Sequence, residues 1–195
     1  MNKFIVENTK FDEVLLLTPR VFTDDRGYFC ETYNHENLRD LGFLENLVQD
    51  NESKSKINVI RGLHYQWDKP MGKLVRVVKG SIIDVMVDFR KGSPTYGDHM
   101  KVLLSDENKK QIWIPPGFAH GILSLEDDTY VSYKCSSVYN QNGEGGINPF
   151  DEQINIDWGI SKQDAVLSEK DFNAMSFIDY NKDPKFLYKE KNKNV

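Results

Sequence analysis

Two side chains that can move protons, His64 and Tyr133, occur in separate runs of residues with the pattern of β-strands. The imidazole lies in residues 61–66 (RGLHYQ), three positions after a guanidinium, and the phenol lies in residues 130–135 (YVSYKC). An imidazole titrates near neutral pH and can accept a proton, whereas a phenol stays protonated there and can donate one. If the two runs form facing walls of a β-barrel, they supply the base and the acid of a proton-transfer site.

Both residue types also have a purely structural interpretation. A strand histidine can simply be satisfied by hydrogen bonds inside a barrel, and a strand tyrosine can pack in the core or at the rim. If one strand covers residues 130–139, alternation places Tyr133 and Tyr139 on one face and Tyr130 on the other, barring a bulge. The packing interpretation therefore fits Tyr130 best, and Tyr133 is the candidate acid.

Two cations near these runs, Arg61 and Lys73, can stabilise an anionic oxygen. Arg61 and His64 are three positions apart, so strict alternation would direct their side chains to opposite faces of the sheet. A bulge at Gly62 would bring both side chains into one cavity. Lys73 begins another predicted strand, and its composition alone favours a solvated residue at a sheet edge.

Short runs with strand patterns dominate the chain and must position these side chains. Residues 73–78 and 82–89 flank residues 79–81 (KGS), which are typical of a hairpin turn. In residues 82–89, four apolar side chains alternate with a second face that carries Asp84. Turn-forming residues recur about every 8–12 positions, which predicts an all-β sandwich or barrel with a few short peripheral helices.

The composition is that of an ordinary globular protein. The chain has 195 residues, 39% hydrophobic and 28% charged, so we expect one domain over residues 1–195 with a tail that frays from about residue 185. A net charge of −5 argues against nucleic-acid binding. No apolar run could span a membrane, no secretory signal is visible, and Cys30 and Cys135 form no disulfide framework. A cytoplasmic location is the default expectation.

Seven short motifs resemble those of the dTDP-4-dehydrorhamnose 3,5-epimerase family. They fall in family order along the chain, and from residue 25 to residue 171 they span most of it. The motifs are residues 25–29 (DRGYF), 49–51 (QDN), 61–66 (RGLHYQ), 88–95 (DFRKGSPT), 116–121 (PGFAHG), 133–134 (YK) and 167–171 (LSEKD). The resemblance implies a cupin-type jelly-roll barrel, a homodimer that exchanges N-terminal strands, no cofactor, and a dTDP-linked 4-keto-6-deoxy sugar as substrate.

The same resemblance implies the roles of the reacting groups. A 4-keto sugar has acidic protons at C3 and C5, and inverting each carbon requires a base, an opposing acid and a partner for the enolate oxygen. His64 matches the family's base, Tyr133 its proton donor, and Asp171 the carboxylate that orients the base. Lys73 and Arg61 match the residues that stabilise the enolate and the nearby phosphate.

Two alternatives concern the carboxylate that would orient the base. Residues 168–171 (SEKD) also fit a variant of the helix capping box, with Ser168 as the N-cap, so a capping role competes for the Asp171 side chain. Asp84 is a second candidate partner of His64, because it faces away from the apolar side of its strand. The sequence does not separate Asp84 from Asp171.

The resemblance also implies contacts with the nucleotide or sugar. The matched residues are Arg26, Glu31, Gln49, Asn51, Arg61, Lys73, His120 and Glu144. Arg26 and Glu31 are expected to reach into the site of a partner subunit. Turn or surface positions are the structural alternative for such residues. No metal is expected, because Gln66 stands two positions after His64, where many cupins have a second histidine ligand.

The expected reaction inverts C3 and C5 of dTDP-4-dehydro-6-deoxy-D-glucose, through an enolate, to give dTDP-4-dehydro-L-rhamnose. An epimerase that inverts one carbon, or that acts on another nucleotide-linked 4-keto sugar, needs the same residues and stays an alternative. A non-catalytic sugar-binding cupin is disfavoured by the presence of all four reacting groups, and a metal-dependent oxygenase by the missing ligand pair. Residues 146–152 (GINPFDE) depart from the family pattern and are interpreted as a varied loop beside the substrate.

Overall fold

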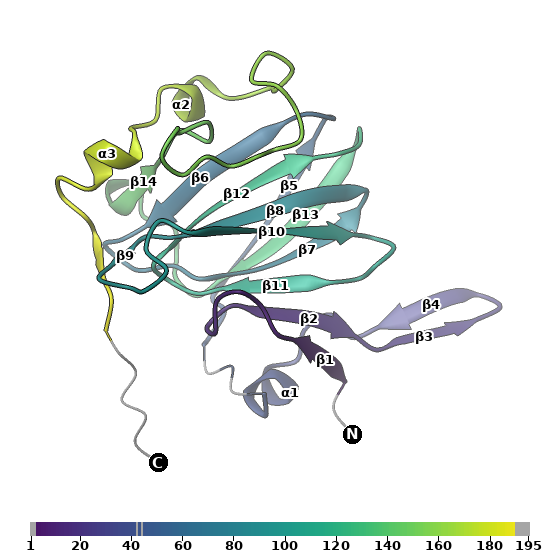
Figure 1. Cartoon of the computed structure of the whole chain (residues 1–195). Coiled ribbons are helices and arrows are strands. Elements are labelled where there is room, and N and C mark those ends of the chain that lie inside the picture. Colours follow the sequence, from purple (N-terminus) through teal and green to yellow (C-terminus); the bar gives the residue numbers. More distant parts are fainter. Residues whose placement is uncertain (1–2, 42, 44, 190–195) are drawn as a thin grey trace.

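The computed structural model of the chain describes residues 3–41, 43 and 45–189 and consists mainly of antiparallel strands in two large sheets (Figure 1). The six-stranded sheet has the order β1 (Phe4–Glu7), β2 (Leu15–Pro19), β11 (Gln111–Ile114), β7 (Lys73–Lys79), β13 (Thr129–Cys135) and β5 (Gln49–Ser55). The five-stranded sheet has the order β10 (His99–Ser105), β8 (Ser81–Asp88), β12 (Phe118–Ser124), β6 (Ile60–Gln66) and β14 (Glu144–Gly146). The all-β prediction is confirmed.

Smaller elements surround the two sheets. A hairpin is formed by β3 (Val21–Asp24) and β4 (Gly27–Cys30), and a parallel pair by β9 (Arg90–Lys91) and β15 (Phe186–Leu187). The helices are α1 (His35–Arg39), α2 (Glu169–Phe172), α3 (Phe177–Tyr180) and a 3₁₀ turn at Gln141–Gly143. Within the described residues, no helix is long and apolar enough to cross a membrane. The predicted short peripheral helices are therefore present.

An apolar core lies between the two sheets and holds them together. Strand β8 shows how it forms, because alternation directs Ile82, Asp84 and Met86 to the interior and Val85 and Val87 to the outer face. Both faces of β8 are buried, although the sequence suggested one apolar and one mixed face. The buried residues of the interior core are Phe11, Val14, Leu16, Val75, Val77, Ile82, Met86, Leu104, Ile112, Ile114, Phe118, Ile122 and Val131.

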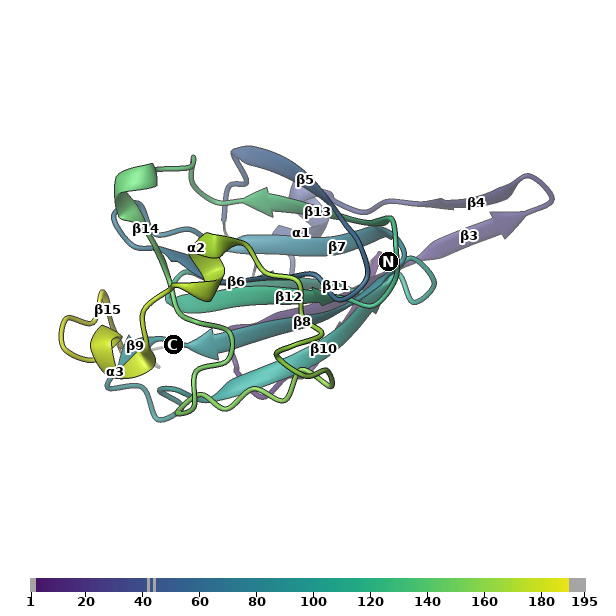
Figure 2. The ribbon, with the colours of Figure 1, turned by 90° about the horizontal axis from the view of Figure 1, so that it is seen from above.

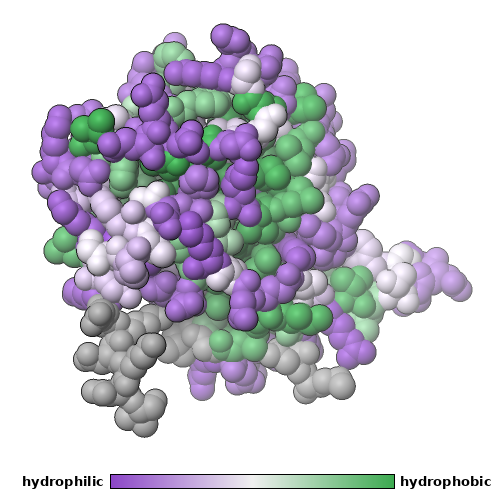
Figure 3. Space-filling model, in the orientation of Figure 1, coloured by the Kyte–Doolittle hydropathy of each residue, from purple (hydrophilic) through white to green (hydrophobic). Residues whose placement is uncertain are grey.

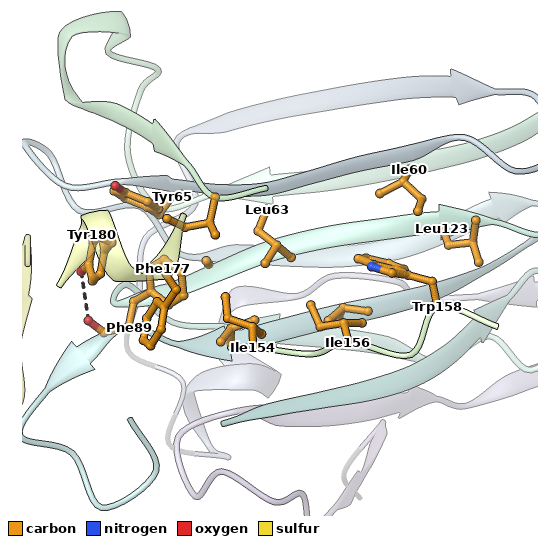
Figure 4. Packing of buried hydrophobic residues seen from close by; sticks show 14 residues of the cluster. Ile60, Leu63, Tyr65, Phe89, Leu123, Ile154, Ile156, Trp158, Phe177 and Tyr180 are labelled. Carbon is orange, nitrogen blue, oxygen red and sulfur yellow. Dashed lines mark hydrogen bonds between the residues drawn. The ribbon is translucent and has the colours of Figure 1, made fainter. Parts of the chain in front are cut away.

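The outer face of the five-stranded sheet is covered by residues 147–189, which we call the C-terminal cover (Figures 1 and 4). Its Trp158 is buried and donates Nε1–H to the Pro149 carbonyl at 2.8 Å. Its Tyr180 donates a hydroxyl hydrogen to the Phe89 carbonyl at 3.0 Å, the bond drawn in Figure 4. Helix α2 belongs to this cover, so the cover determines where Asp171 lies.

The hairpin of β3 and β4 extends away from the two sheets (Figures 1 and 2). Its strands pair only with each other among the described residues. Phe22 is 47% exposed and Phe29 is 68% exposed, which is unusual for large apolar side chains. The projecting arm is hydrophilic at its tip and more hydrophobic near its base (Figure 3).

Two boundaries differ from the sequence-based expectation. Strand β13 ends at Cys135, so Tyr139 lies in the following loop and not on the same strand as Tyr133. Paired structure extends past residue 185, where the tail was expected to begin, because β15 pairs with β9 and the Tyr188 N–H donates to the Lys91 carbonyl at 2.9 Å. Residues 190–195 of the predicted tail lie outside the described residues.

Candidate active site

Side chains from both sheets line a cavity in the interior of the sandwich. It consists of two adjoining hollows that share His64 from β6, Lys73 from β7 and Tyr133 from β13. Strand β6 belongs to the five-stranded sheet, whereas β7 and β13 belong to the six-stranded sheet. The candidate base and the candidate acid therefore reach the cavity from opposite walls, as the sequence predicted.

The His64 imidazole is held by a carboxylate from the C-terminal cover. Its Nε2 lies 2.6 Å from Oδ1 of Asp171, and the other oxygen of that carboxylate accepts the Gly62 N–H at 3.4 Å. Burial alone would raise the pKa of Asp171, but the hydrogen bonds and the charge of His64 lower it overall. The Asp171 N–H donates to the Ser168 hydroxyl at 3.1 Å, so Ser168 caps α2 while the Asp171 side chain binds His64.

A shift of register at Gly62 brings Arg61 and His64 to the same cavity. The pairing of β6 with β12 slips between these two residues. Gly62 has a φ of +127° and is followed by a cis peptide bond. A Cβ at Gly62 would lie only 2.5 Å from the Gly121 Cα, so this position requires glycine. The predicted bulge is confirmed, and the Arg61 guanidinium donates to the Ser55 hydroxyl at 3.0 Å beside the cavity.

A second imidazole and carboxylate pair lies deeper in the sandwich. His120 lines the cavity, and its Nε2 lies 2.9 Å from Oδ2 of Asp84. Asp84 is fully buried, and its partner is His120, so the alternative pairing of Asp84 with His64 is wrong. Burial lowers the pKa of His120, and the nearby Asp84 opposes this effect only in part.

Lys73 and Tyr133 are partly buried, and their protonation responds to that burial. No described residue forms a hydrogen bond or ion pair with the Lys73 ammonium. Burial lowers the pKa of Lys73, although Cys135 and nearby carboxylates oppose this effect. Burial raises the pKa of Tyr133, Cys135 acts in the same direction, and Arg61 opposes both. At neutral pH the phenol is therefore protonated and can act as a donor.

Four polar side chains line the neighbouring part of the cavity and bind one another. Gln49 Nε2 donates to Asn51 Oδ1 at 3.1 Å, and Gln49 Oε1 accepts the Tyr139 N–H at 2.8 Å. Glu144 accepts the Tyr139 hydroxyl at 2.9 Å and the Lys170 ammonium at 2.5 Å. Burial alone would raise the pKa of Glu144, but Lys170 and Tyr139 lower it overall. The structure thus brings Gln49, Asn51 and Glu144 together, as predicted.

Arg26 and Glu31 do not reach the cavity of their own chain. Arg26 lies at the tip of the β3–β4 hairpin, where its guanidinium pairs with Asp24 at 2.6 Å. Glu31 follows the hairpin and pairs with Lys3 at 3.0 Å. The other six residues predicted to bind the substrate line the cavity.

Several cavity residues are absent from the sequence-based candidates. They are Ser53, Tyr65, Gln66, Met71, Ile122, Val131, Cys135 and Tyr139. Alternation with His64 and Tyr133 could have indicated Gln66 and Cys135, because residues two apart on a strand share a face. Met71 and Tyr139 come from loops, whose path leaves no periodic signal in the sequence.

The segment that departs from the family pattern, residues 146–152, lies at the start of the C-terminal cover and packs within it. Ile147 is fully buried, and Asn148 Nδ2 donates to the Phe172 carbonyl at 2.8 Å. Phe150 returns an N–H to the Asn148 side chain at 2.9 Å. Residues 147–152 do not line the cavity, so their interpretation as a loop beside the substrate differs from the structure. Their variation concerns packing of the cover.

Many cupins hold a metal ion with histidine and carboxylate ligands, so clusters of such side chains bear on the chemistry of this site. In residues 3–41, 43 and 45–189, no three His, Cys, Asp or Glu side chains form a group that could hold a metal ion. The His64–Asp171 and His120–Asp84 pairs each combine one imidazole with one carboxylate. Each pair alone offers fewer ligands than a structural or catalytic zinc site uses.

Known proteins of similar sequence and structure belong to one enzyme family. Residues 8–179 match the family model described as dTDP-4-dehydrorhamnose 3,5-epimerase. Relatives of that name from Methanothermobacter thermautotrophicus and Shigella flexneri are 48% and 46% identical, over 89% of this chain and 94% and 96% of theirs. A crystal structure of dTDP-6-deoxy-D-glucose-3,5-epimerase from Legionella pneumophila with dTDP-4-keto-L-rhamnose has a TM-score of 0.92 and 40% identity, covering 96% of this chain and 100% of that one. This likeness confirms the predicted jelly-roll fold.

Proposed function

The chain belongs to the dTDP-4-dehydrorhamnose 3,5-epimerase family, and we propose how its cavity carries out the family's reaction. It is an isomerase that inverts C3 and C5 of dTDP-4-dehydro-6-deoxy-D-glucose to give dTDP-4-dehydro-L-rhamnose. Inversion of one carbon only is not favoured, because the similar relatives are named as 3,5-epimerases. The Legionella relative carries the product-like sugar nucleotide in its crystal structure, which supports the same ligand for this chain.

His64 is the base in this proposal. The protons at C3 and C5 are acidic because the C4 carbonyl takes up the charge as an enolate. When Asp171 accepts the Nε2–H of His64, the lone pair of Nδ1 is available to remove either proton. The ionised Asp171 also stabilises the imidazolium that forms, which is the role of the carboxylate in other carboxylate–histidine dyads.

Tyr133 is the proposed acid that completes each inversion. A proton returned from the wall opposite the base arrives on the other face of the sugar ring, which inverts the carbon. The position of Tyr133 on β13, across the cavity from His64 on β6, supports this role and is the single observation that carries the proposal. The enolate oxygen would be stabilised by the ammonium of Lys73, assisted by Arg61.

The remaining polar residues of the cavity are proposed to bind the nucleotide and the sugar. Gln49, Asn51 and Glu144 line one hollow of the cavity, and Arg61 and His120 line the other. The cationic Arg61 suits the diphosphate because a guanidinium can bind two phosphate oxygens at once. The reaction moves protons only and transfers no electrons, so the proposal requires no cofactor.

A second copy of the chain is proposed to complete the site. Arg26 and Glu31 match the family's substrate-binding residues, yet they lie on or next to a hairpin that extends away from their own sheets. The exposed Phe22 and Phe29 of this hairpin support contact with another protein surface. We therefore propose a homodimer with exchanged N-terminal strands, in which Arg26 and Glu31 serve the partner's cavity.

Exchange in heavy water tests the reaction. The protein is incubated with dTDP-4-keto-6-deoxyglucose in D₂O, and deuterium is located by NMR. Label at both C3 and C5 in a product of inverted configuration is expected, whereas label at one carbon would select a mono-epimerase. His64→Ala should abolish exchange at both carbons. Exchange that survives this substitution would show that His64 is not the shared base.

Mixed dimers test the exchanged arrangement. Arg26→Ala and His64→Ala chains are each expected to be nearly inactive alone. After co-refolding in equal amounts, about half of the dimers are mixed, and each mixed dimer has one complete site, so about a quarter of the sites recover. Recovery is expected only if Arg26 acts in the partner's cavity. Mixed samples as inactive as the separate variants would contradict the proposal.

Two further proposals concern the whole chain. We propose that residues 1–195 form one jelly-roll domain, because both large sheets share the interior core. We also propose that the protein acts in the cytoplasm, which is supported by the free thiols of Cys30 and Cys135. Measuring a single cooperative unfolding transition would support the first proposal, and fractionation of cells would test the second.

A further inference from the structure

One oxygen of Asp84 distinguishes this residue from the other buried aspartates. Asp84 is fully buried on the interior face of β8, and its Oδ1 has no hydrogen-bond partner among the described residues. By contrast, Asp88 on the same strand binds Arg90, Ser93 and Thr95. An unpartnered buried carboxylate oxygen is costly, so a residue kept only for folding would be expected to satisfy it.

The surroundings of Asp84 are rich in basic side chains. Its Oδ2 lies 2.9 Å from His120, and His120 lines the same hollow as His64, Arg61 and Lys73. The Lys73 ammonium reaches this hollow from the opposite sheet and has no ion-pair partner among the described residues. A buried negative charge behind this wall would act on all of these groups, because electrostatic interactions strengthen in a poorly solvated interior.

Other groups near Lys73 are less suited to balance its charge. Glu144 already binds the Lys170 ammonium at 2.5 Å and the Tyr139 hydroxyl at 2.9 Å. Burial raises the pKa of Cys135, so its thiol is neutral at physiological pH. The Tyr133 phenol is neutral for the same reason. The charged and titratable groups that act on Lys73 are Cys135, Asp84 and Glu144, and of these Asp84 is the fully buried carboxylate that retains an oxygen without a partner among the described residues.

We propose that Asp84 is a positioning residue for the reaction, which fixes the orientation of the His120 imidazole and supplies the negative charge that keeps Lys73 protonated. This inference rests on the proposed function, because it assigns Lys73 to the enolate oxygen. With the Nε2–H of His120 directed to Asp84, its Nδ1 is left as a hydrogen-bond acceptor. His120 would thus receive a hydroxyl hydrogen of the sugar.

The test compares Asp84→Asn with Asp88→Asn, a matched change on the same face of the same strand. The rate of label incorporation from D₂O is measured from pH 6 to 10 for wild type and both variants. Neutralising Asp84 should move the alkaline decline in rate to lower pH by on the order of one unit, because Lys73 loses its proton earlier. Asp88→Asn should leave the position of this decline unchanged. A decline that moves no further in Asp84→Asn than in Asp88→Asn would overturn the proposal.

Two measurements test the role of Asp84 separately from the proposed epimerase function. In a Lys73→Arg background, Asp84→Asn should no longer move the decline, because a guanidinium stays charged. A persisting shift would show that Asp84 does not act through Lys73. In the unaltered protein, ¹⁵N NMR of His120 should show the Nε2–H tautomer, and an Nδ1–H tautomer would contradict the positioning role. Absence of any exchange in wild type would instead refute the proposed function.

Discussion

The Nε2 atom of His64 lies 2.6 Å from Oδ1 of Asp171, although the two residues are 107 positions apart and belong to different layers of the fold. His64 is on a strand of the five-stranded sheet, and Asp171 is on a short helix of the C-terminal cover. The helix is begun by Ser168, which binds the Asp171 N–H and leaves the carboxylate free. The imidazole is thereby oriented from outside the sandwich.

Asp171→Asn is expected to lower the rate of label incorporation by about a hundred- to ten-thousand-fold, because an amide can hold the imidazole in the wrong tautomer and cannot stabilise its charge. The matched control is Asp179→Asn. Asp179 also stands three positions after a capping serine, Ser176, but its side chain is exposed. Equal rates for the two variants, measured by NMR in D₂O, would show that Asp171 does not assist the base.

Tyr133→Phe is expected to separate exchange from inversion. His64 would still remove a proton and return a deuteron to the same face, while the loss of the opposing donor would slow inversion by about a hundred-fold or more. NMR can count labelled substrate of unchanged configuration against inverted product. Tyr130→Phe is the control, because Tyr130 does not line the cavity. Inversion by Tyr133→Phe at the control rate would exclude Tyr133 as the donor.

Lys73 is expected to set an alkaline limit to activity. Burial places the pKa of Lys73 below its ordinary value of 10.5, and the protonated form is the one that stabilises the enolate. Activity should therefore be lost as pH rises through this lowered pKa, at a lower pH than for a solvated lysine. Lys73→Arg should move the decline to higher pH, even if the rate at neutral pH falls. An unchanged position of the decline would assign it to another group.

Phe177→Ala is expected to lower the free energy of unfolding by about 3–5 kcal/mol, because this buried side chain of the C-terminal cover packs with Phe89 and Tyr180. The neighbouring Ile178 in the same helix is 54% exposed, so Ile178→Ala should change the stability by no more than about 0.5 kcal/mol. Urea unfolding measures both. Similar losses in the two variants would show that the cover contributes little through this contact.

Local patterns were enough to predict the walls of the cavity. Strand alternation and turn spacing predicted an all-β fold, and the spacing of Arg61 and His64 required a bulge that the structure places at Gly62. Alternation alone could not place Lys73 in the cavity, since its position at the start of a strand and its composition favour a solvated residue at a sheet edge. The resemblance to a family supplied that assignment, and Lys73 does line the cavity.

The features that the sequence did not predict depend on how distant segments pack against one another. The family resemblance favoured Asp171 as the partner of His64, but Asp84 stayed a second candidate, because the choice depends on how the cover lies against the sheet and not on any local pattern. The end of β13 before Tyr139, the pairing of Phe186 with Arg90 and the packing of residues 147–152 have the same origin. Each depends on contacts between segments distant in the sequence.

Because Asp171 lies in the C-terminal cover, a newly made chain acquires this carboxylate only after all strands of the two large sheets have been synthesised. All strands of the two large sheets precede residue 147, so they leave the ribosome before α2 does. A nascent chain could assemble both walls of the cavity and still lack the carboxylate that orients the base. Competence would then arise late in synthesis, because a chain interrupted before Asp171 lacks the carboxylate that orients the base.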